Sequence, residues 1–131
     1  MGRLEAGRWL EQAAWDLRAG QDSRAAGNYE WACFQAQQAA EKALKSYLLA
    51  TGRARAVTHS VRQLLIECEA VEAEFGALRP AAELDQYYIP TRYPNGLPDG
   101  VPHDYYTIEV AERCLSLATS VIEFVKRSSA S

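Results

Sequence analysis

The sequence predicts an all-α fold, an antiparallel, up-and-down bundle of four to five helices. Apolar residues recur at three- and four-residue steps through most of the chain, which is the spacing of amphipathic helices. No segment alternates as a half-buried strand does, and glycine and proline divide the 131 residues into helical lengths. We expect a single domain over residues 1–131, with its core from about residue 4 to residue 127.

The first two predicted helices cover the N-terminal part of the chain. The first runs from about residue 4 to residue 19, and a short polar connection between Gly20 and Gly27 follows it. The second begins after Asn28, a plausible N-cap, and ends near Gly52. Its many alanines allow close-packed neighbours, so we place this helix at the centre of the bundle.

Two shorter helices are predicted next. Ser60 and Gln63 form a capping-box pattern ahead of an apolar run, so a third helix begins here and fades near Gly76. Pro80 suits the first turn of a fourth helix, because proline is tolerated where no intrahelical hydrogen bond is needed.

A proline-rich loop over residues 90–103 separates these helices from the last one. Its four prolines exclude a helix or a central strand. The last helix is expected from about Asp104 to Arg127, followed by a frayed tail.

Composition limits the possible functions. With 14 basic and 17 acidic residues and a net charge of -3, the chain does not resemble a basic nucleic-acid coat protein, so any nucleic-acid contact must be local. Neither an export signal nor a membrane span is apparent, and we expect a cytoplasmic protein. Each of the three cysteines, Cys33, Cys68 and Cys114, falls in an apolar stripe, and we interpret them as reduced core thiols.

The common catalytic templates are absent from the sequence. It contains no phosphate-binding loop, no HExxH zinc motif and no GxSxG elbow, and we expect neither a metal nor a cofactor. A cation, Arg92, and an imidazole, His103, flank the proline-rich loop instead. Arg92 either clamps a phosphate or has a structural role, pairing with Asp85 or capping open carbonyls. His103 is either an acid–base group or a surface residue.

A second group of polar residues has the same two interpretations. Lys42 and Lys45, with His59 and Arg92, are candidates to line a pocket for a nucleotide phosphate. Alternatively, Lys45 forms a surface i, i+4 ion pair with Glu41, and His59 packs at the start of the third helix.

Several segments together resemble the HEPN domain of small prokaryotic proteins. They are the block AQQAAEKALK at residues 36–45, Thr58-His59-Ser60, Tyr87-Tyr88 and Thr91-Arg92-Tyr93-Pro94, and the similarity extends from about Trp9 to Phe124. The resemblance implies a helical bundle that forms homodimers and is often encoded beside a minimal nucleotidyltransferase in a toxin–antitoxin-like pair.

The resemblance also implies site residues. Several branches of this family are metal-independent ribonucleases whose motif is an Arg followed, after four to six residues, by a His near the last helix. A Tyr two residues beyond the His can be modified by the partner. On this chain these residues are Arg92, His103 and Tyr105, but ten residues separate Arg92 from His103.

This wider spacing favours a subunit that binds nucleotide, RNA or a nucleotidyltransferase partner. The alternatives are a metal-independent endoribonuclease that uses Arg92 and His103, and a structural helical dimer without catalysis.

Overall fold

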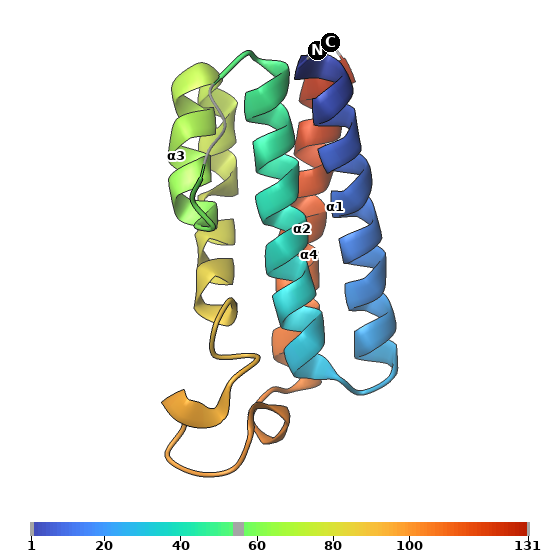
Figure 1. The fold of residues 1–131 in the computed structure, drawn as a ribbon, viewed down its shortest axis with the longest axis vertical. Coiled ribbons are helices and arrows are strands. Elements are labelled where there is room, and N and C mark those ends of the chain that lie inside the picture. The colour runs from blue at the N-terminus through green and yellow to red at the C-terminus, as the bar shows by residue number, and fades with distance from the viewer. Residues whose placement is uncertain (1, 54–56, 131) are drawn as a thin grey trace.

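The computed structural model describes residues 2–53 and 57–130. It confirms an all-α bundle, and the described residues include no strand (Figure 1). The α-helices are α1 (Gly2–Ala25), α2 (Tyr29–Ala50), α3 (Val61–Val71) and α4 (Ile108–Ala130). Three 3₁₀ segments complete the fold, η1 (Ala73–Tyr87), η2 (Pro94–Gly96) and η3 (Pro102–Asp104).

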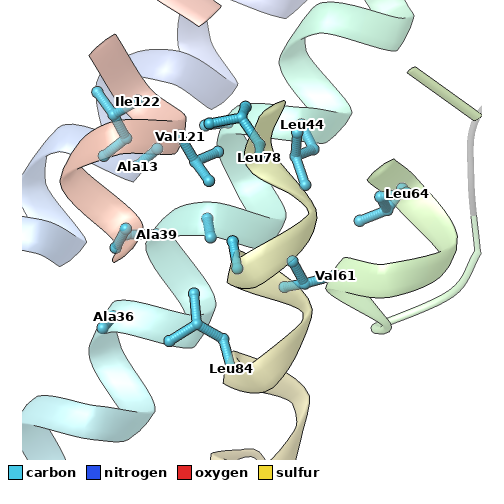
Figure 2. Close-up of a cluster of buried hydrophobic side chains, with 14 of the residues drawn as sticks. Ala13, Ala36, Ala39, Leu44, Val61, Leu64, Leu78, Leu84, Val121 and Ile122 are labelled. Carbon is cyan, nitrogen blue, oxygen red and sulfur yellow. The ribbon is translucent and has the colours of Figure 1, made fainter. Parts of the chain in front are cut away.

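Helix α2 is the central helix, as its alanines predict. It packs against α1, α3, α4 and η1, and five of its alanines are fully buried in the core, at positions 32, 36, 39, 40 and 43. Figure 2 shows alanines 36 and 39 of α2 among larger apolar side chains from the other elements. Small side chains on one face let several helices approach one central helix closely.

Helix α1 is longer than predicted, because Gly20 does not end it. Gly20 is buried inside α1, and a Cβ atom there would lie 2.8 Å from Cδ2 of Leu115 and 3.4 Å from the carbonyl oxygen of Ala32. The glycine therefore permits close packing of α1 against α2 and α4. The turn lies farther on, at Gly27, whose φ of 84° is in the left-handed region that favours glycine.

The predicted boundary at Pro80 is also wrong. Helix α3 ends at Val71. The next residue, Glu72, has an extended backbone, and η1 then continues through Gly76 and Pro80 without a break. Phe75 and Leu78 are buried in the core and hold the first half of η1 there. The bounds of η1 therefore depend on these core contacts and not on Pro80.

Helix α4 begins at Ile108, later than predicted, because η3 ends at Asp104 and a turn with irregular backbone over residues 105–107 follows it. The proline-rich loop, which contains η2 and η3, lies at one end of the bundle, and the start of α1 and the end of α4 lie at the other (Figure 1). None of the described helices combines the length and the apolar character needed to span a bilayer.

Candidate functional site

One face of α2 carries the residues around which the candidate site is built. Glu30, Phe34, Gln37, Glu41 and Lys45 follow one another at steps of three and four residues, so they form a single stripe along the helix. Each contacts another candidate residue or helps to position one.

The guanidinium group of Arg92 is held by aromatic rings. Its Cζ atom lies 4.3 Å from the ring centroid of Phe34, 4.8 Å from that of Tyr88 and 5.3 Å from that of Tyr93. Its Nε donates a hydrogen bond to the carbonyl oxygen of Tyr88 at 2.8 Å. Within the described residues no carboxylate forms an ion pair with Arg92, so its charge is fixed in position but not neutralised.

Asp85 does not pair with Arg92. Its carboxylate accepts hydrogen bonds from the backbone N–H groups of Val61 and Arg62 and from the hydroxyl of Ser60. Ser60 Oγ in turn accepts from Gln63 N, which confirms Ser60 as the cap of α3. Asp85 therefore joins the end of η1 to the start of α3.

His59 meets the stripe at Glu41. Its Nδ1 lies 3.2 Å from Glu41 Oε2, and its ring stacks on Tyr88 with centroids 5.4 Å apart and planes at 20°. Its backbone carbonyl accepts a hydrogen bond from the buried amide of Gln37. Since Arg92 also lies over Tyr88, this ring connects the imidazole to the guanidinium group.

The two candidate lysines are both paired with carboxylates. Lys45 forms its expected ion pair with Glu41 at 2.9 Å, but the expected surface location is wrong: the side chains are only 10% and 5% exposed. Lys42 lies apart from the site and pairs with Asp16 of α1. These carboxylates balance both lysine charges, whereas Arg92 has no such partner in the described chain.

His103 contacts a different residue of the stripe. Its Nδ1 is 3.0 Å from a carboxylate oxygen of Glu30, a buried side chain. No hydrogen bond, ion pair or ring contact joins His103 to Arg92 in the described part of the chain. Glu30 and Phe34, their respective neighbours, are one helical turn apart on α2.

Tyr105 is exposed at the edge of the proline-rich loop. Its hydroxyl donates to the carboxylate and to the carbonyl oxygen of Asp99, at 2.7 and 2.8 Å. The hydrogen bond to this carboxylate raises the pKa of Tyr105.

Sequence reasoning missed two partners of the histidines. Glu30 and Glu41 are buried on α2 and hold His103 and His59 respectively. A carboxylate among the alanines of a helix assigned to the centre of the bundle is the signal that could have found them, because a buried acid requires a polar partner.

One cavity lies away from Arg92. It measures about 580 Å³, lies between α3 and η1, and is lined by residues that include Leu65, Ile66 and Arg79. A ligand at Arg92 would therefore bind on the surface of the bundle rather than in this cavity.

Known proteins are similar to this chain in sequence and in fold. Residues 6–128 match the HEPN domain family. The crystal structure of TT1696 from Thermus thermophilus is 47% identical, covers 97% of this chain and 98% of its own, and has a TM-score of 0.88. ST0689, an archaeal HEPN homologue, is 34% identical, with coverages of 95% and 97% and a TM-score of 0.79. The HEPN domain protein TM0613 from Thermotoga maritima is 33% identical, with coverages of 92% and 95% and a TM-score of 0.72. No curated protein matches the chain.

Proposed function

Because the chain belongs to the HEPN domain family, we propose that it is the RNA- or nucleotide-binding subunit of a toxin–antitoxin-like pair and that Arg92 anchors a phosphate group. The observation that carries this proposal is the environment of the Arg92 guanidinium group. Three rings and one backbone carbonyl fix its guanidinium group, and no carboxylate in the described chain neutralises it.

A fixed guanidinium group suits a phosphate for two reasons. Its planar N–H groups match two phosphate oxygens, and its charge persists at every physiological pH. The surrounding rings exclude water from one side, which strengthens the attraction, and exposed rings such as Tyr93 offer a surface on which an unpaired base can stack. The net charge of -3 implies that this attraction is local.

Binding of a fluorescent single-stranded RNA and of nucleotides, measured by anisotropy, tests the proposal. Arg92→Ala is expected to weaken binding by about 1–3 kcal/mol. It should also reduce the slope of the logarithm of the binding constant against the logarithm of the salt concentration by about one, the value for one lost phosphate contact. Arg127→Ala is the matched control, because Arg127 also lies over a ring, that of Phe124, but on the last turns of α4. Equal affinities of wild type and Arg92→Ala would refute the proposed anchor.

A nucleotidyltransferase is the proposed protein partner, and Tyr105 is its proposed modification site. The phenol is 42% exposed, and its hydroxyl is held by Asp99, outside the core. Co-expression with a minimal nucleotidyltransferase, followed by mass spectrometry, is expected to show a nucleotide adduct on Tyr105 that Tyr105→Phe abolishes. An adduct on another tyrosine instead would rule out this assignment.

We also propose that the chain forms a homodimer. Trp15 and Trp31 are 59% and 44% exposed, and exposed tryptophans are enriched at subunit interfaces. Sedimentation of the wild type is expected to show a dimer, with a larger monomer fraction in Trp15→Ala or Trp31→Ala. A monomeric wild type at high protein concentration would contradict this part of the proposal and the structural-dimer alternative as well.

A further inference from the structure

The cavity between α3 and η1 has apolar walls. The two elements follow each other in the chain and lie on the side of the bundle opposite α1 (Figure 1). On α3 the walls are formed by Leu65, which is buried, and by Ile66, which is 46% exposed. Ala70 and Ala82 are small, so they leave room between the two elements. The volume of about 580 Å³ is typical of sites for small molecules, which measure roughly 300–1,000 Å³.

An ion pair closes the cavity at one end. Arg79 of η1 reaches across to Glu69 of α3, with Nη2 2.7 Å from one carboxylate oxygen and Nε 3.3 Å from the other. The pair lies toward the turn between the two elements, because a Cβ atom at Gly76, near the start of η1, would lie 3.3 Å from a carboxylate oxygen of Glu69. A partner helix laid along α3 would have to displace this ion pair, whereas a short ligand ends before it. The cavity therefore suits a small molecule.

Arg62 contributes an unpaired positive charge to the same cavity. It is in the first turn of α3, seven residues before Glu69, which is about 10 Å along the helix axis. The residues one helical turn farther on are apolar, so α3 offers its guanidinium group no acidic neighbour. No carboxylate elsewhere in residues 2–53 and 57–130 forms an ion pair with Arg62, and that of Asp85 accepts its backbone N–H instead. Because Arg79 is neutralised by Glu69, the lining carries one positive charge in excess.

We propose that this cavity binds a small organic acid that carries one carboxylate on an apolar chain. The carboxylate accepts hydrogen bonds from the guanidinium group of Arg62, whose planar N–H groups match two carboxylate oxygens. The chain lies against Ile66 and Ala82 and extends toward the ion pair that closes the cavity. Apolar walls and one excess positive charge thus select for the two parts of the ligand. This site does not include Arg92 and does not depend on the proposed function.

Sodium decanoate is the probe, and its binding is followed by NMR through the backbone amide shifts of the nitrogen-15-labelled protein. Saturable shift changes are expected in α3 and η1. Octanoate has two methylene groups fewer and should bind roughly 15-fold more weakly, because each buried methylene strengthens binding about fourfold. Decyltrimethylammonium has the same chain and the opposite charge, and it should bind at least about 10-fold more weakly than decanoate.

Two substitutions locate the ligand within the cavity. Arg62→Ala should weaken decanoate binding about 5- to 10-fold, and Gln63→Ala, at the next position and outside the lining, is its matched control. Ile66→Asp puts a carboxylate into the apolar wall and should abolish binding, whereas Ile89→Asp changes an isoleucine that is 52% exposed elsewhere and should not. All four side chains are exposed, so the substitutions leave the core intact, and circular dichroism checks that each variant folds.

Failure of decanoate to bind, equal binding of decyltrimethylammonium, or full affinity in both Arg62→Ala and Ile66→Asp would each overturn the proposal. So would shift changes confined to residues outside α3 and η1. Arg92→Ala is expected to bind decanoate as the wild type does, and a loss in this variant alone would assign the acid to the phosphate site instead. RNA and nucleotide binding, measured on the same variants, is expected to depend on Arg92 and not on Arg62, so the two proposals fail independently.

Discussion

Asp85 joins two parts of the site with a single carboxylate. It caps the N-terminus of α3 from a distant point of the sequence, and it lies three residues before Tyr88, the ring shared by His59 and Arg92. A carboxylate at this position satisfies N–H groups that have no partner within the helix and interacts favourably with the helix dipole. Loss of Asp85 should therefore affect both stability and the position of His59.

Asp85→Ala is expected to lower the free energy of unfolding by about 1–2 kcal/mol, the range measured for lost helix caps. Urea titration followed by circular dichroism measures this change. Asp99→Ala is the matched control: Asp99 lies in an exposed part of the proline-rich loop and is expected to change stability by no more than about 0.5 kcal/mol. A similar loss in both variants would show that Asp85 does not act as a cap.

At the scale of elements, local signals predicted which helices form better than they predicted where each helix begins and ends. The bounds of α2 agree with prediction. Asn28 stands at the N-cap position, although its side chain makes no capping hydrogen bond, and Gly52, whose φ is 80°, follows the last turn. Gly20 and Pro80 misled the prediction because their roles depend on partners elsewhere in the fold. Gly20 accommodates Leu115 of α4, and η1 is held by core contacts on both sides of Pro80.

For the site, the sequence likewise predicted some of the residues but not the contacts between them. Arg92 and His59 stand out in the sequence as a cation and an imidazole, and the structure connects them through Tyr88. The pairing of His59 with Glu41 joins residues 18 positions apart, which sequence spacing within one helix cannot reveal. The burial of the pair between Glu41 and Lys45 likewise depends on elements packed over α2.

Gly20 provides a test of this packing argument. Glycine to alanine normally stabilises a helix interior by about 1 kcal/mol, but Gly20→Ala is expected to destabilise the bundle by about 1–3 kcal/mol because its Cβ would meet Leu115. Thermal and urea unfolding measure the change. Gly7→Ala in the same helix meets no atom within 4 Å and should stabilise the protein. Stabilisation by both substitutions would refute the close contact at Gly20.

The core as a whole contains groups whose protonated form is favoured by folding. Burial raises the pKa of Cys68 to about 12 and that of Tyr47 to about 12, Tyr47 also through its hydrogen bond to Glu72. The pKa of Cys114 is raised as well, first by its hydrogen bond with Cys33 and then by burial. These thiols and this phenol come from α2, α3 and α4, so their ionisation opposes packing throughout the bundle.

The bundle should therefore lose stability at alkaline pH. A thiol whose pKa is higher in the folded state stabilises the fold fully below its unfolded pKa, here 9.0, and this contribution is lost as the pH rises toward 12. Between pH 7.5 and pH 10.5 Cys68 alone should reduce the free energy of unfolding by about 2 kcal/mol. Urea unfolding at both pH values measures the loss, and Cys68→Ala should remove that part of it whatever its effect at pH 7.5. An unchanged pH dependence in Cys68→Ala would show that this thiol does not couple ionisation to folding.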